Sequence, residues 1–179
     1  MEKQLTFTDY LARLPREKVS VTRALEPYFE HSTPDLHRIL QTSGKPLIVL
    51  FEHRHCRDCD ELHREGLKRP DARKLLGRFS VVQLDFLGAR KVVTPLGKTT
   101  NEGEWARALN VVYTPSFVFF SANGEEVFRA EGYMRPFHLA ATLEYVASGV
   151  YRSEPSFQRF LQKRADALRA KGVNTDLWK

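Results

Sequence analysis

A short apolar segment followed at once by two cysteines most constrains the fold of this chain. The segment runs from Pro46 to Phe51, and Cys56 and Cys59, the two cysteines of the chain, come directly after it. A short apolar run that ends in polar residues is typical of a buried strand. If a helix begins at Cys56, the two thiols lie about one turn apart, within the roughly 4.4–6.8 Å between Cα atoms that a disulfide needs. The sequence therefore predicts a strand, a cysteine pair that can open and close, and a helix in succession.

The composition indicates one soluble domain with additional terminal segments. The chain has 179 residues, of which 42% are hydrophobic and 28% are charged, as in ordinary globular domains. The longest apolar stretch, Leu47 to Phe51, is far shorter than the roughly 18 residues of a transmembrane helix. Lys and Arg outnumber Asp and Glu by 28 to 22, but they are spread among acidic residues. We therefore expect no membrane span and no nucleic-acid binding.

Helix and strand patterns alternate along the chain in an informative order. In chain order, the predicted elements are helical segments over 6–31 and 34–44, a strand over 46–52, helices over 56–66 and 70–76, a strand over 80–86, a loop or small hairpin over 88–100, a helix over 101–109, strands over 116–120 and 126–130, and helices over 135–147 and 155–170. We expect Thr33 and Asn101 to cap the helices that follow them. The first two strands should be parallel, because a helix connects them, and the last two should form a hairpin. This order is typical of an α/β protein with a thioredoxin fold, in which helices flank a central mixed sheet.

Motifs around and beyond the cysteines support a more specific resemblance. They lie at Phe51–Cys59 and, within 96–151, at 97–100, at 113–120 and at Gly132-Tyr133. With these motifs the chain resembles the thioredoxin superfamily, and within it the SoxW-like thioredoxins of bacterial sulfur-oxidation systems, over roughly residues 35–160. We accordingly expect an N-terminal helical extension over 1–34, a thioredoxin-like domain over 35–150, and a C-terminal helix and tail over 151–179.

The resemblance implies a role for each cysteine. Cys56 is the expected nucleophile and Cys59 the resolving thiol, and a helix N-terminus at Cys56 would favour its thiolate. Such a thiolate attacks a substrate disulfide. We therefore expect a thiol–disulfide oxidoreductase that exchanges with protein disulfides, acts as a reductant, takes electrons from a thiol donor and needs no cofactor. The resemblance implies a periplasmic location. The first residues lack the pattern of a secretory signal, so a periplasmic location requires that a signal was removed. The alternative is a cytoplasmic location.

Thr114 and Pro115 are the expected substrate-binding residues. They correspond to the proline that the family keeps in cis beside the active site, where the backbone of Thr114 would pair with an extended substrate peptide. An ordinary trans proline at the start of a strand is the alternative.

Four residues near the cysteines are candidates for tuning their reactivity. Arg57 and Asp58 have opposite effects on a nearby thiolate, and His55 would stabilise the thiolate if it were protonated. Thioredoxin has a buried aspartate where this chain has Leu50. Glu52, which lies on the same strand face, is the nearest carboxylate that could accept the proton of the resolving thiol; the alternative is a solvent-facing glutamate at the strand end.

Two other classes of function compete with this interpretation. A zinc or copper site is the first, because nitrogen and sulfur ligands are grouped in a short stretch: His53, His55, Cys56, Cys59 and His63. The second is a non-catalytic interaction module with a thioredoxin fold, in which the helices over 6–31 and 154–170 form the contact surface. Against the second, the same helices can instead cover the core of their own domain.

Overall fold

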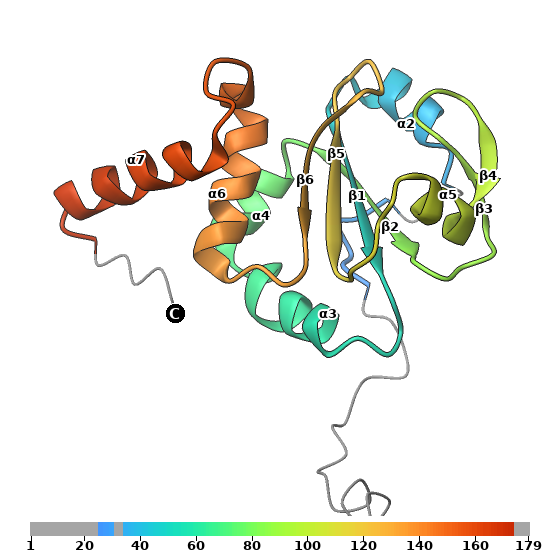
Figure 1. Ribbon diagram of the computed structural model, residues 1–179, viewed down its shortest axis with the longest axis horizontal. Coiled ribbons are helices and arrows are strands. Elements are labelled where there is room, and N and C mark those ends of the chain that lie inside the picture. Colours follow the sequence, from blue (N-terminus) through green and yellow to red (C-terminus); the bar gives the residue numbers. More distant parts are fainter. Residues whose placement is uncertain (1–24, 31–33, 174–179) are drawn as a thin grey trace, which may run out of the picture.

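A four-stranded mixed sheet forms the centre of the computed structural model, which describes residues 25–30 and 34–173 (Figure 1). The strands are β1 (Leu47–Glu52), β2 (Ser80–Asp85), β5 (Ser116–Phe120) and β6 (Glu126–Glu131), in the order β2-β1-β5-β6. β1 pairs with β2 in parallel, whereas β5 is antiparallel to both β1 and β6. The predicted parallel pair and the predicted hairpin are therefore both confirmed.

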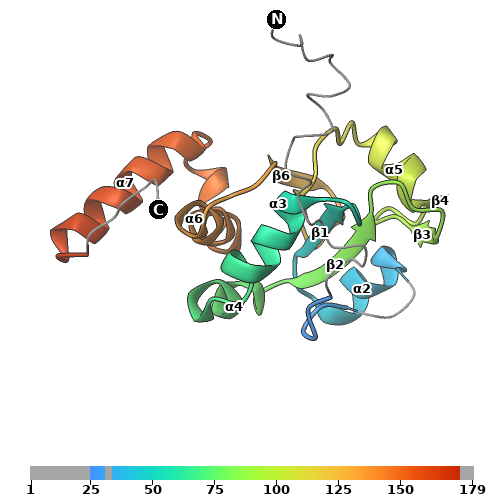
Figure 2. The ribbon, with the colours of Figure 1, turned by 90° about the horizontal axis from the view of Figure 1, so that it is seen from below.

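Helices cover both faces of this sheet (Figure 2). One face carries α4 (Pro70–Leu76), α6 (Pro136–Ala147) and the helix of the cysteines, in which α3 (Arg57–Glu61) continues as a π-helical segment, η1 (Leu62–Gly66). The other face carries α2 (Leu36–Ser43), α5 (Glu102–Ala108) and a small hairpin of β3 (Lys91–Val93) and β4 (Thr99–Asn101). Asn101 caps α5 by accepting a hydrogen bond from the backbone N–H of Glu104, as predicted.

The alternation of side chains along β1 links the two layers to the site. Ile48 and Leu50 lie in the core beneath α4 and α6, whereas Val49 and Phe51 lie in the core beneath α2 and α5. Since successive side chains of a strand point to opposite faces, Glu52 belongs to the same face as Leu50. The end of β1 therefore presents a carboxylate towards the helix that carries the cysteines.

The start of α2 differs from the prediction. The helix begins at Leu36, where the side chain of Asp35 accepts a hydrogen bond of 2.9 Å from the backbone N–H of Arg38. Pro34 and Asp35 stay outside the helix, because the backbone N–H of Val93 donates to the carbonyl of Pro34 and Asp35 forms a β-bridge with Val93. The cap is thus Asp35; the predicted capping residue, Thr33, lies outside the described residues.

Residues 25–30 form turns instead of the end of a predicted helix, because the N–H of Phe29 closes a turn onto the carbonyl of Glu26. The rest of that predicted segment, 6–24, lies outside the described residues. The turn segment is attached firmly: Phe29 is buried in the core, the Tyr28 hydroxyl donates to the carbonyl of Leu67, and the N–H of Glu30 donates to the carbonyl of Val81. Glu26 is thereby held against the main domain.

The C-terminal helix α7 (Phe157–Ala170) packs its aromatic residues on the rest of the domain. It follows a short 3-10 helix, η2 (Val150–Arg152), and begins after Ser156, whose side chain caps it. The rings of Phe157 and Phe160 lie 5.3 and 5.0 Å from the ring of Tyr145 on α6. These contacts support the interpretation that the helix covers its own domain.

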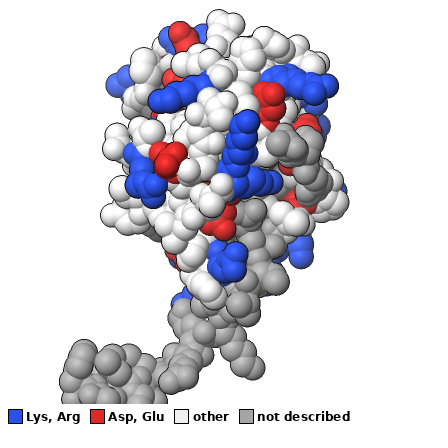
Figure 3. All heavy atoms as spheres, turned by 90° about the vertical axis from the view of Figure 1, so that its right-hand side faces the viewer, with Lys and Arg blue, Asp and Glu red and all other residues white. Residues whose placement is uncertain are grey.

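The distribution of surface charges and the length of the helices agree with what the composition indicates. On the face that carries α2, α5 and the small hairpin, Lys and Arg side chains are interspersed with Asp and Glu (Figure 3). None of the helices within 25–30 and 34–173 combines the length and the apolar character that crossing a membrane requires.

Candidate redox site

The two cysteines form a disulfide at the start of α3, directly after the carboxyl end of β1. Their Cα atoms are 5.2 Å apart. Cys56 has an extended backbone and is the N-cap residue of α3, and its Sγ accepts a hydrogen bond of 3.1 Å from the backbone N–H of Cys59. Cys56 is 8% exposed and Cys59 is 4% exposed. The predicted cysteine pair is therefore present, with Cys56 at the helix end and Cys59 inside the first turn.

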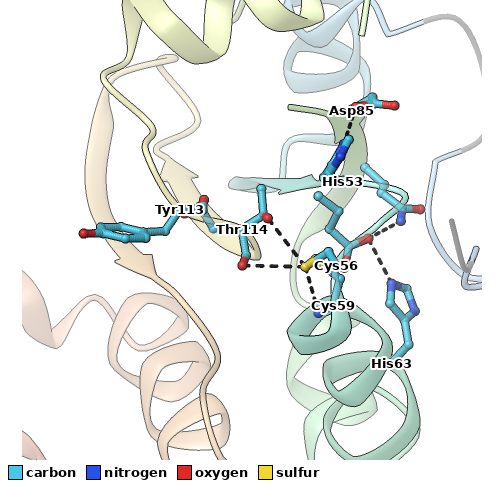
Figure 4. Close-up of a disulfide and its surroundings, with 10 residues drawn as sticks. His53, Cys56, Cys59, His63, Asp85, Tyr113 and Thr114 are labelled. Atoms are coloured by element: carbon cyan, nitrogen blue, oxygen red, sulfur yellow. Dashed lines mark hydrogen bonds and ion pairs between the residues drawn. A yellow bond between two sulfur atoms is a disulfide. The ribbon is translucent and has the colours of Figure 1, made fainter. Parts of the chain in front are cut away.

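The loop before β5 brings Thr114 against Cys56 (Figure 4). The hydroxyl of Thr114 donates to Cys56 Sγ at 3.5 Å, and the carbonyl oxygen of Thr114 lies 3.6 Å from the same sulfur. The Thr114–Pro115 peptide bond is cis, and Pro115 is buried. The structure thus brings the predicted substrate-binding residues next to the predicted nucleophile, although they are 58 residues apart in sequence.

Two apolar side chains stand exposed beside this loop. Val112 is 63% exposed and Tyr113 is 64% exposed, and Figure 4 shows Tyr113 pointing away from the disulfide. Sequence reasoning did not single them out as site residues, although their position immediately before Thr114-Pro115 was a usable signal. Exposed apolar groups next to a reactive site are candidates for contact with a partner.

A buried carboxylate lies behind the cysteines. Glu52 is fully buried, so the alternative of a solvent-facing glutamate is wrong. Its Oε2 accepts hydrogen bonds from His63 Nε2 at 3.0 Å and from Gln83 Nε2. Its Oε1 is buried and has no hydrogen-bond partner among the described residues. A buried carboxylate oxygen without a donor is costly, and a catalytic or redox role is one explanation for such a group.

His63 occupies the centre of a buried charged group. Its Nδ1 lies 2.8 Å from Glu26 Oε1, and its Nε2 bonds to Glu52 on the opposite side. Burial by itself lowers the pKa of His63, but the hydrogen bonds and charges of Glu52 and Glu26 outweigh burial, so the pKa is raised above its usual value. Figure 4 shows His63 further along the helix of the cysteines, and Cys59 and His63 are four residues apart. No local sequence pattern pointed to Glu26, which is 37 residues from its partner.

The remaining tuning candidates lie at the surface. His55, Arg57 and Asp58 are exposed, and the His55 ring lies 5.8 Å from that of His53. His53 Nδ1 is 3.9 Å from a carboxylate oxygen of Asp85 at the end of β2. These side chains form the polar rim of the site.

The structure does not bring the residues of the alternative metal site together. Within the described part of the chain, no three His, Cys, Asp or Glu side chains are placed to hold a metal ion. The cysteines are bonded to each other, and both ring nitrogens of His63 are occupied by carboxylates. The five residues proposed as ligands therefore do not converge.

Comparison with known proteins supports the same fold. A family model described as a thioredoxin-like domain matches residues 35–147. The chain belongs to this thioredoxin-like family. It is similar to a thioredoxin-fold protein from Helicobacter pylori, with 21% identity and a TM-score of 0.56 over 70% of this chain and 82% of that one. It is also similar to a thioredoxin from Thermus thermophilus, with 27% identity and a TM-score of 0.50 over 64% of this chain and 88% of that one. Comparison with curated proteins gives no match. The predicted thioredoxin fold is confirmed, and the narrower resemblance to SoxW-like proteins stays a prediction.

Proposed function

We propose that the protein is a thiol–disulfide oxidoreductase that reduces disulfides of partner proteins with the Cys56–Cys59 pair. One observation carries the proposal, and it is the position of Cys56. This residue is the N-cap of α3, and its Sγ lies 3.6 Å from the carbonyl oxygen of Thr114. A helix N-terminus stabilises a thiolate, since its unpaired N–H groups and the helix dipole favour negative charge. After reduction, the N–H of Cys59 and the Thr114 hydroxyl would both be available to the Cys56 thiolate as donors.

The exchange has two steps. The Cys56 thiolate attacks one sulfur of a substrate disulfide, a bond forms between Cys56 and that sulfur, and the other substrate sulfur leaves as a thiolate. Cys59 then loses its proton and attacks Cys56 Sγ, which closes the Cys56–Cys59 disulfide and releases the second substrate sulfur as a thiolate. Two electrons pass from the pair to the substrate, whose thiolates take protons from solvent. A thiol donor returns the pair to its reduced form by the reverse chemistry.

Glu52 is the proposed acceptor of the Cys59 proton. Its Oε1 is buried without a donor, and His63, which holds its Oε2, lies one helical turn after Cys59. A buried thiol needs a nearby base because water cannot take its proton directly. The side chains of His55, Arg57 and Asp58 would adjust the balance between the thiol and the thiolate at Cys56, since exposed charges act on it through partly screened fields.

Thr114 and Pro115 are the proposed contact for the substrate backbone. The carbonyl of Thr114 faces Cys56 Sγ, so a peptide laid along this loop would present its disulfide to the nucleophile. Val112 and Tyr113 would add apolar contact to the same peptide, because both are largely exposed. A protein substrate would use these contacts, whereas a small disulfide would not.

Location is a separate part of the proposal. The resemblance to SoxW-like proteins leads us to propose the periplasm, where disulfide exchange is common. Fractionation of cells that express the complete gene should recover the protein with periplasmic markers; recovery with cytoplasmic markers would favour the alternative.

Trapping of mixed disulfides tests the order of attack. Cys59→Ser should accumulate complexes with partner proteins that a reductant dissolves, because the first step proceeds and the second cannot. Cys56→Ser should accumulate none, and the double variant gives the background. Equal trapping by both single variants would contradict the assignment of the nucleophile.

A further inference from the structure

We propose that Glu26, which precedes the region matched by the family, is a positioning residue of the redox site. Through His63 it places a cation beside the carboxylate of Glu52, the proposed acceptor of the Cys59 proton in the resolving attack. This inference rests on the proposed function and adds a residue that lies outside residues 35–147.

With both carboxylates ionised, the hydrogen bonds of this group require a charged imidazole. A neutral imidazole has one N–H donor, whereas an imidazolium has two. Both ring nitrogens of His63 face carboxylate oxygens, Glu26 Oε1 at 2.8 Å and Glu52 Oε2 at 3.0 Å. With both carboxylates ionised, only the imidazolium can donate to both. Loss of that proton would leave a ring nitrogen and a carboxylate oxygen facing each other as two acceptors.

Burial strengthens the electrostatic interaction between the His63 ring and the two carboxylates. The side chains of Glu26, His63 and Glu52 are 9%, 5% and 0% exposed, so solvent screens them little. A buried charge is costly unless an opposite charge and hydrogen-bond donors lie beside it. The imidazolium of His63 is the cation beside Glu52 Oε2, and Gln83 donates a further, neutral hydrogen bond to that oxygen.

Glu26 determines whether His63 can fulfil that role. Burial favours the neutral ring, and the raised pKa of His63 depends on both carboxylates. The groups around the ring are Glu52 from β1, Glu26 from the turn segment, and the Phe29 ring, 6.4 Å away. Beside Glu26 lies Tyr28, whose ring faces the Arg73 guanidinium at 5.1 Å, and the charge of Glu26 adds to the burial that raises the pKa of this tyrosine.

The turn segment is built to hold Glu26 in place. Its backbone and side chains are tied to the domain by the hydrogen bonds of Tyr28 and Glu30 and by the buried ring of Phe29. The partners of these contacts, Leu67 and Val81, lie within the thioredoxin-like domain, so the domain itself fixes the position of the carboxylate. A segment outside the family region thus completes the charged group behind the cysteines.

Glu26→Gln tests the proposal because the amide keeps the shape and removes the charge. Glu30→Gln is the matched control, since Glu30 lies on the same segment and its side chain is exposed. Two readouts are needed: the pH titration of the His63 ring by NMR, and the rate of the resolving step. For the second, reduced protein is mixed with one equivalent of Ellman's reagent, in which the attack of Cys56 releases the first coloured thiolate and the attack of Cys59 releases the second.

In the Glu26→Gln variant, we expect the His63 titration to move to lower pH and the release of the second thiolate to slow about tenfold or more at pH 7, which corresponds to a shift of about one pH unit. The rate should recover as the pH rises, as expected if the substitution slows a deprotonation. Glu30→Gln should match the wild type in both readouts. Glu26→Asp, which keeps the charge on a shorter side chain, should lie closer to the wild type than Glu26→Gln.

The outcomes separate this inference from the proposed function. If wild-type protein releases no second thiolate and Cys59→Ser traps no partner, both fall. If wild-type protein resolves normally and the pH profile of Glu26→Gln coincides with it, the role of Glu26 alone is overturned. The role is also overturned if Glu26→Asp is impaired more than Glu26→Gln, because that order indicates dependence on shape and not on charge.

Discussion

Replacement of His63 by glutamine should destabilise the oxidised protein strongly near neutral pH. The substitution removes the cation between two buried carboxylates that lie 2.8 and 3.0 Å from its ring nitrogens. Removal of one partner from a buried ion pair costs about 3–5 kcal/mol, because an uncompensated charge remains in the interior. With a urea dependence of about 2 kcal/mol per molar for a domain of this size, the midpoint of unfolding should fall by roughly 1.5–2.5 M.

Urea unfolding followed by tryptophan fluorescence measures this change, since Trp105 is buried and stacks on Phe120. His55→Gln is the control: His55 is exposed, and surface substitutions usually change the free energy of unfolding by less than about 0.5 kcal/mol. A cost below about 1 kcal/mol for His63→Gln would refute the interpretation of this group as a buried ionic cluster.

The pH dependence of the same variant has a definite sign. The pKa of His63 is raised in the folded protein, so the folded state holds the proton more tightly than the unfolded chain. This contribution to stability is fully present below about pH 6.5, the unfolded value, and is lost as the pH rises through the raised folded pKa. Wild-type stability should therefore fall over that range, and the fall should be absent in His63→Gln. Parallel curves for the two proteins would contradict the shift.

Three further substitutions probe the core, the substrate surface and the C-terminal helix. Trp105→Ala should cost about 3–5 kcal/mol in urea unfolding, because it removes a buried ring that contacts Phe51 and Phe120; a loss under about 1 kcal/mol would contradict the packing. Tyr113→Ala should lower kcat/KM several-fold for a protein disulfide and leave that for a small disulfide unchanged, since the exposed ring contacts only a larger partner; equal effects on both substrates would argue against this role. Hydrogen bonds from Arg159 and Lys163 hold the pKa of Glu154 at about 2, so their stabilisation is lost as the pH falls from about 4.5 towards 2. Glu154→Gln should therefore show a shallower decrease in melting temperature over this range, and an unchanged slope would contradict the contribution of these pairs.

Local patterns were sufficient to predict the central sheet. The apolar run before the cysteines and the cap at Asn101 each depend on neighbouring residues, and both predicted features are observed. The start of α2 was mispredicted because Pro34 and Asp35 pair with Val93, which lies far along the chain, and this pairing keeps them outside the helix. Tertiary contacts of this kind override a local capping preference.

The candidate site was predictable in part. Spacing placed Cys56 and Cys59 together, and strand alternation placed Glu52 on the same strand face as Leu50. The burial of Glu52 and its pairing with Glu26 through His63 could not be read from the sequence, because no periodicity connects a turn residue with a helix 37 positions away. The sequence presented His63 as a possible metal ligand, and only the packed structure shows that carboxylates occupy both of its nitrogens.

The most direct test of the account is a single turnover with a disulfide-bonded protein such as insulin, followed by peptide mapping of the oxidised product. Arg54, Arg57 and Arg64 are trypsin sites around the pair, so the Cys56–Cys59 disulfide should appear as two short peptides joined through sulfur. We expect one substrate disulfide to be reduced for each chain, with this linked peptide pair as the sole product of oxidation. Formation of no substrate thiols, or oxidation of the protein without the Cys56–Cys59 link, would contradict the central claim.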